Sequence, residues 1–194
     1  MTEQKFIGSY YTKKVNDRIR LLYSNYCEFP QMIEGYEDGL TLLITSIKSC
    51  ERRRDRGDLG VRVQTSIIQN TTAQIAVENV MVEEMIASGE LGDMTFKDLE
   101  DARDVSLGMD ELNLMKLEYK AFKKWFEALP EEERKILLDD MHGMKGGTEI
   151  ADELGITTEA LYVKVSRIKK KLYDRIKTFM CNYDENMVRI GGNE

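Results

Sequence analysis

The residues with the clearest potential for chemistry lie between Leu161 and Lys177, where seven basic side chains stand against one acid, Asp174. These basic residues are Lys164, Arg167, Lys169, Lys170, Lys171, Arg175 and Lys177. Clustered Lys and Arg side chains release counterions from nucleic-acid phosphates, whatever the total charge of the protein. The cluster therefore predicts a phosphate-contacting surface, although a run of charges alone can also be a solvated helix face.

The residues around this cluster predict the element that carries it. A short apolar-patterned helix is expected over residues 148–154, with Leu154 on its inner face. Gly155 then ends that helix, because glycine accepts a left-handed backbone, and Thr157 can cap the next one. At about 100° per residue, one stripe of this second helix is apolar. The stripe consists of Leu161, Val165, Ile168 and Leu172.

The side of the second helix away from that stripe is left free to bind. A short helix, a turn containing glycine and a longer helix form a helix-turn-helix, whose second helix enters the major groove of DNA. The residues expected at base edges, after the cap Thr157, are Thr158, Glu159, Tyr162, Val163 and Ser166. The residues expected on or towards phosphates are Lys164, Arg167, Lys169, Lys170 and Lys171. Double-stranded DNA is therefore the expected partner.

The composition places this basic segment on an otherwise acidic protein. The 194 residues carry a net charge of −7, which should discourage the rest of the chain from lying on DNA. Hydrophobic residues at 42% and charged residues at 32% are typical of a soluble globular protein. No apolar run is long enough to span a bilayer, and the N-terminus lacks a signal-peptide core. We therefore expect a cytoplasmic protein without membrane contacts.

Chemistry beyond binding is not expected. Cys27, Cys50 and Cys181 lie far apart, and with His142 as the only histidine they cannot form a zinc-ligand cluster. No glycine-rich phosphate loop follows a strand. His142 is interpreted as a turn residue at the end of a helix. The sequence thus predicts neither an enzyme nor a cofactor.

The remaining pattern predicts an all-α chain, since it has only two prolines and almost no strand-like alternation. Helices are expected over residues 15–29, ended or kinked by Pro30, and over 32–54, where the arginines at 52–54 are interpreted as a solvated end. Another is expected from an Asn70 cap to Ser88. A seam of apolar residues at heptad spacing then comprises Leu112, Met115, Tyr119, Phe122, Phe126 and Leu129.

The predicted organisation has four parts. A further helix begins at Leu129-Pro130, where proline and the following glutamates suit a first turn. The chain is expected to comprise a helical N-terminal region (1–104), a connecting amphipathic helix (105–128), a helix-turn-helix domain (129–182) and a tail (183–194).

The last third of the chain resembles the promoter-binding region 4 of bacterial sigma factors. The matching residues are 129–134, 149–151 and 154–157, with Lys164, Arg167 and Lys169. Together with YSNYCEFPQMI and QNTTAQIAVENVM in the first half, they make the chain similar to the ArpU/RinA family of phage-encoded transcriptional activators. The resemblance implies a phage or prophage activator of late genes. It also implies contact with RNA polymerase, through the C-terminal part or through the acidic middle.

Two alternatives stay open. One is a phage DNA-packaging adaptor such as a small terminase subunit, although there the helix-turn-helix precedes the oligomerising helices. The other is a sigma-like RNA polymerase-binding factor. A complete sigma factor needs an aromatic-rich basic helix to capture unstacked bases, and the only tryptophan, Trp125, lies in the predicted connecting helix. The sequence leaves open whether the chain forms homo-oligomers.

Overall fold

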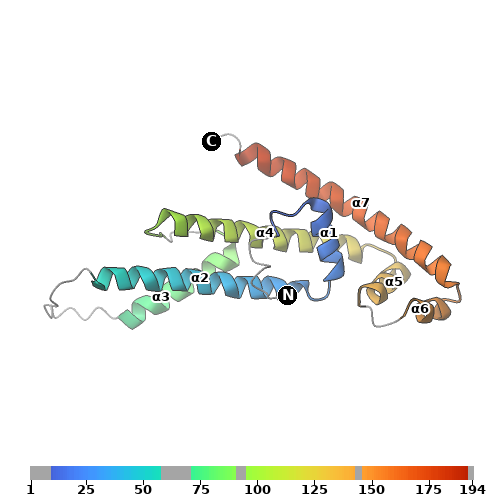
Figure 1. The fold of residues 1–194 in the computed structure, drawn as a ribbon, viewed down its shortest axis with the longest axis horizontal. Helices are drawn as coiled ribbons and strands as arrows, with labels where there is room; N and C mark the ends of the chain where they lie inside the picture. Colours follow the sequence, from blue (N-terminus) through green and yellow to red (C-terminus); the bar gives the residue numbers. More distant parts are fainter. Residues whose placement is uncertain (1–9, 58–70, 91–94, 143–145, 192–194) are drawn as a thin grey trace. The chain divides into compact units, whose positions relative to one another are not determined.

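The protein is all-α, as the sequence predicts. The computed structural model describes residues 10–57, 71–90, 95–142 and 146–191 (Figure 1). Within these ranges there are helices and no strands. The helices are α1 (Val15–Ser24), α2 (Phe29–Gly57), α3 (Thr71–Ser88), α4 (Leu99–Glu127), α5 (Glu131–His142), α6 (Gly147–Glu153) and α7 (Thr158–Gly191).

The chain divides into two compact units that do not follow the sequence in order. The described residues of Met32–Leu114 belong to unit 1, and those of Ser9–Gln31 and Met115–Glu194 belong to unit 2. The first helix of the chain is therefore part of the same unit as the predicted helix-turn-helix. The domain boundaries expected from the sequence remain a prediction, but α7 continues to Gly191, well into the residues assigned to a tail.

Two helix boundaries differ from the predicted ones, and each has a local cause. Pro30 does not end a helix, because α1 stops at Ser24 and α2 begins at Phe29, which places the proline in a first turn where its missing N–H costs nothing. The connecting helix is predicted to begin at residue 105, but α4 begins at Leu99. The carboxylate of Asp98 accepts a hydrogen bond from the Glu100 backbone N–H at 3.0 Å, as a cap does.

Unit 1 packs parts of α2 and α4 together with α3. The apolar core includes Tyr36, Leu40, Ile44, Val82 and Met109, which are all buried. The Tyr36 hydroxyl donates to the buried carboxylate of Glu111 at 2.9 Å. Arg52 forms an ion pair with Glu78 of α3, so one arginine of the predicted solvated helix end instead holds two helices together. The predicted cap Asn70 lies outside the described residues.

A buried carboxylate joins the end of α2 to the residues that precede α4. Glu51 accepts hydrogen bonds from the backbone N–H of Lys97 at 2.6 Å and from the Lys48 ammonium at 3.1 Å. Burial alone would raise the pKa of Glu51, but the hydrogen bond from Lys97 and the neighbouring Lys48 outweigh it and lower the pKa below its ordinary value of 4.5. The ionised form is therefore the one that the fold stabilises.

Replacing Glu51 with glutamine is expected to lower the free energy of unfolding at pH 7 by about 1.5–3 kcal/mol, because hydrogen bonds to a charged group are lost. A lowered folded-state pKa contributes stability above the unfolded-state pKa and loses it as the pH falls through the folded-state pKa. Urea unfolding at pH 7 and pH 3 should thus show the difference between wild type and Glu51→Gln shrinking in acid. An undiminished difference at pH 3 would contradict the charged role of Glu51.

Unit 2 has an aromatic core around the C-terminal part of α4. The apolar seam predicted on that helix is confirmed, since Met115, Phe122, Phe126 and Leu129 are buried. Tyr26 packs on Phe126 with ring centroids 4.7 Å apart, and Phe29 stacks on Tyr119 at 5.5 Å. The residues that cover the seam thus come from the beginning of the chain.

One ion pair is completely enclosed in this core. Glu118, whose side chain is 1% exposed, lies 2.9 Å from the guanidinium of Arg18 of α1. The Tyr10 hydroxyl donates to the same carboxylate at 2.6 Å, and Arg18 donates at 3.0 Å to the carbonyl oxygen of Lys13. Partners of opposite charge and additional hydrogen bonds are what a buried carboxylate requires. This cluster fixes α1 and the residues before it to α4.

Candidate nucleic-acid interface

The helix pair at the predicted DNA-binding site begins with the short helix α6. Ile150 and Ala151 on it are buried, and Gly155 follows with a φ of 65°, a left-handed conformation that favours glycine. The Ile156 backbone N–H donates to the Ala151 carbonyl at 3.0 Å, which closes the turn. Leu154 was expected on the inner face, but it is 38% exposed because α6 has ended before it.

The long helix α7 then begins where the sequence predicts. The Thr157 hydroxyl accepts a hydrogen bond from the Ala160 backbone N–H at 3.2 Å, the capping geometry expected of it. Leu161, Val165, Ile168 and Leu172 are all buried, which confirms the packed stripe. In Figure 1, α5 and α6 lie against the first half of α7, and α1 crosses it further along.

The opposite side of α7 is exposed. Tyr162 is 62% exposed and Val163 is 49% exposed, and the side chains of Glu159, Ser166 and Lys170 on the same side are exposed as well. Thr158 is half-buried. A Cβ atom placed on Gly147 would lie 2.9 Å from the Tyr162 hydroxyl oxygen, so this ring rests against the first residue of α6. Two large apolar side chains thus remain in solvent at the beginning of α7.

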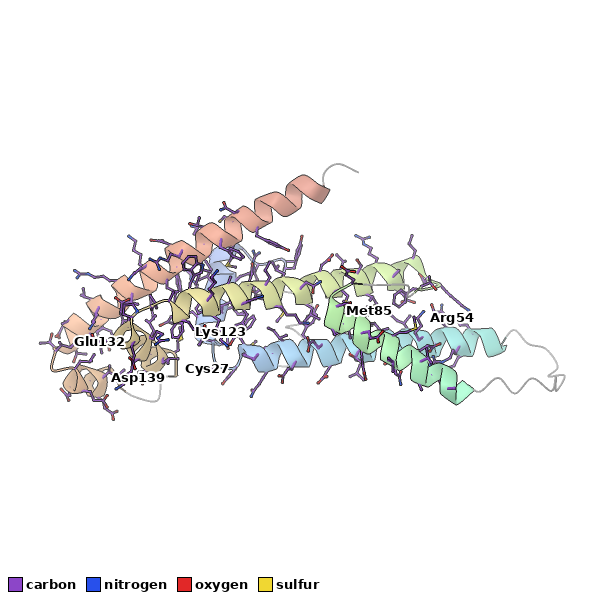
Figure 2. All side chains as sticks on the ribbon, turned by 180° about the vertical axis from the view of Figure 1, so that it is seen from behind. Cys27, Arg54, Met85, Lys123, Glu132 and Asp139 are labelled. Carbon is purple, nitrogen blue, oxygen red and sulfur yellow. The ribbon has the colours of Figure 1, made fainter. Side chains whose placement is uncertain are left out.

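The five cations of α7 that are predicted to contact phosphates divide into two groups. Lys164 lies 4.0 Å from Glu132, Lys171 lies 3.4 Å from Glu133, and Lys169 lies 2.7 Å from Asp140. All three acids belong to α5, since Glu132 and Glu133 lie in its first turn and Asp140 lies near its end. Figure 2 labels Glu132 and Asp139, the neighbour of Asp140 in the sequence. Arg167 and Lys170 are exposed, and no ion pair to them is present among the described residues.

Lys169 is held inside unit 2 rather than projecting from the exposed side. Besides Asp140, it lies 4.6 Å from the centre of the Tyr23 ring of α1. The Tyr23 hydroxyl donates to Asp140 at 2.6 Å, and its ring meets Tyr173 edge-on at 5.8 Å. Burial first, and then the hydrogen bond to Asp140, raise the pKa of Tyr23 above its ordinary value of 10.0, so the phenol stays protonated and donates. Three helices meet at this lysine.

The partners of Lys169 were not predicted from the sequence. Asp140 and Tyr23 are 117 positions apart along the chain, and helix periodicity places residues on a face without showing which distant helix covers that face. The acids at the start of α5 were noted only as suitable for a first turn. The sequence feature that could have indicated these ion pairs is the excess of acidic residues on the helix that precedes the basic helix.

A groove of about 550 Å³ lies between α5 and α7. Its lining includes Glu133 from α5 and Glu159, Val163, Lys164 and Arg167 from α7. The groove therefore has both acids and cations at its walls, next to the exposed side of α7. Among the described residues, no group of His, Cys, Asp and Glu is arranged to hold a metal ion.

Comparisons with known proteins found no family model, curated protein or solved structure that matches this chain. None of the described helices is long and apolar enough to cross a bilayer.

Proposed function

We propose that the protein is a sequence-specific DNA-binding transcriptional regulator in which α7 enters the major groove. The observation that supports this most strongly is that α7, which follows the turn after α6, has one buried side and one exposed side. Its packing is completed by the buried stripe from Leu161 to Leu172, yet Tyr162 and Val163 remain 62% and 49% exposed at its beginning. Tyr162 rests against Gly147 of α6, but the buried stripe of α7 includes neither Tyr162 nor Val163. Aromatic and aliphatic side chains at this position of a helix-turn-helix can contact base edges.

The charges of α7 support the same proposal. Arg167 and Lys170 are exposed and available for phosphates, while Glu159 and Ser166 on the exposed side can hydrogen-bond to bases. Lys164, Lys169 and Lys171 have carboxylate partners on α5 in the free protein. The first contacts with phosphates are therefore assigned to Arg167 and Lys170.

The resemblance to sigma region 4 and to the ArpU/RinA activators extends the proposal to the biological role. On that basis, the protein activates late genes of a phage or prophage together with RNA polymerase in the cytoplasm. A promoter fused to a reporter gene tests this role directly. Expression of the protein should raise reporter output from its own target promoter. If the reporter does not respond while the protein assembles rings on packaging-site DNA, the packaging-adaptor alternative replaces the activator.

Tyr162→Ala tests whether α7 contacts bases. We expect the variant to change the order of preference among DNA sequences, because a base contact contributes unequally to different sites. Competition binding with a panel of single-base variants of the target measures that order, and Tyr162→Phe, which keeps the ring, is the matched control. An equal loss of affinity for every sequence would remove Tyr162 from the base contacts.

A further inference from the structure

Glu133 is placed to compete with DNA for the cations of α7. Its carboxylate lies 3.4 Å from the Lys171 ammonium, and its side chain lines the groove together with Lys164 and Arg167. Glu132 adds a weaker contact, 4.0 Å from Lys164. Each of these three cations is a candidate phosphate contact on the helix proposed to enter DNA. In the free protein, Glu133 and Glu132 are thus paired with two of these cations, Lys171 and Lys164.

The place of Glu133 on α5 does not by itself explain this arrangement. Glu131, Glu132 and Glu133 all lie in the first turn of α5, where acids favour the positive end of the helix dipole. That benefit is shared by the three residues and would not require contact with α7. Glu131 is exposed and forms no ion pair among the described residues, whereas Glu133 is directed to Lys171. The contact with α7 is therefore a separate property of Glu133.

We propose that Glu133, with Glu132 as a minor contributor, is an inhibitory residue that weakens the binding of α7 to DNA of any sequence, because it pairs with a cation that would otherwise contact a phosphate. The inference rests on the proposed DNA-binding function. Sequence-independent affinity depends on how many phosphates the protein neutralises. A lysine that is already paired must leave its carboxylate before it binds a phosphate. It therefore contributes less to the free energy of DNA binding than an unpaired lysine does. Phosphate contacts contribute to the complexes with target and with unrelated DNA alike, so the exchange lowers both affinities.

The test is binding of the full-length chain to a duplex of scrambled sequence and to its selected target, measured over a range of salt concentrations. Glu133→Gln should tighten binding to the scrambled duplex by about two- to five-fold, the effect expected of one partly exposed ion pair. Its salt dependence should steepen by about 0.9 in log–log slope for each additional phosphate that the variant neutralises. Affinity for the target should rise by a similar factor, because the same phosphate contacts form in both complexes.

Glu131→Gln is the matched control, since it removes the same charge from the same helix turn without touching α7. Equal tightening by Glu131→Gln and Glu133→Gln would overturn the inference, because net charge alone would explain it. A second check combines Glu133→Gln with Lys171→Ala, in which the Glu133 effect should largely disappear. An unchanged Glu133 effect in that background would also overturn the inference. If the wild-type chain binds neither duplex at low salt, the proposed function itself fails. If the wild-type chain binds DNA and Glu133→Gln leaves that binding unaltered, only the inference about Glu133 fails.

Discussion

Replacing Glu118 with alanine is expected to lower the free energy of unfolding of unit 2 by about 3–5 kcal/mol, because the substitution leaves a buried guanidinium without its carboxylate. Arg18 is 4% exposed and lies 2.9 Å from Glu118, so its guanidinium would be left buried without a charged partner. The Tyr10 hydroxyl loses its acceptor in the same step. Because this cluster attaches the N-terminal residues to α4, α1 should be released from the unit before the rest unfolds.

Chemical denaturation followed by circular dichroism measures the loss in Glu118→Ala. Glu127→Ala is the matched control on the same helix, since Glu127 is 55% exposed and lies 3.9 Å from Lys123. Its removal should change stability little, as is usual for surface pairs. Tyr10→Phe, which removes a single hydrogen bond, should give an intermediate loss of about 1 kcal/mol. A loss from Glu118→Ala no larger than that from Glu127→Ala would contradict the structural role of the buried pair.

The largest effect on binding is expected from Arg167→Ala combined with Lys170→Ala. Both side chains are exposed, and within the part of the chain that the structure describes neither forms an ion pair that must break before it reaches a phosphate. Removing two phosphate contacts should weaken binding to every DNA sequence by about tenfold or more at moderate salt, and should lower the salt slope by about 0.9 for each contact. Filter binding or fluorescence anisotropy at several salt concentrations measures both quantities.

The matched control removes two exposed positive charges from a different helix. Lys123→Ala with Lys124→Ala makes the same change in net charge on α4, and both lysines are exposed. This pair should leave the salt slope close to that of the wild type. If the two double variants weaken binding equally, the phosphate-contacting surface does not lie on α7. Lys169 is a poor choice for this test, since its contacts with Asp140 and Tyr23 make it part of the packing of unit 2.

The sequence was sufficient to predict the local architecture of the candidate site. Helical periodicity identified the buried stripe of α7, and glycine and threonine chemistry located the turn at Gly155 and the cap at Thr157. These features depend on residues close together in the chain. The exposure of Tyr162 and Val163 follows from the same periodicity.

The partners of the site could not be predicted, because they come from distant segments. Nothing in the pattern around Tyr23 or Arg18 indicates that α1 packs in the same unit as α7. The apolar face of an amphipathic helix indicates that another element covers it but does not identify that element. Lys169 illustrates the consequence. From its position on the helix it was assigned to phosphates, and only the fold brings Asp140 within 2.7 Å of its ammonium. Similarly, the sequence predicts that the connecting helix begins at residue 105, but Asp98 caps α4 and the helix begins at Leu99.

Selection of duplexes from a random-sequence pool by the full-length chain tests the central claim most directly. The proposal predicts enrichment of one sequence, which the chain should bind about a thousand-fold or more tightly than scrambled DNA at physiological salt, as sequence-specific proteins do. A palindromic product would indicate a dimer on DNA, and an asymmetric product would indicate a single sigma-like contact. No enrichment, together with no binding to any duplex at low salt, would contradict the assignment of α7 as a DNA-binding helix.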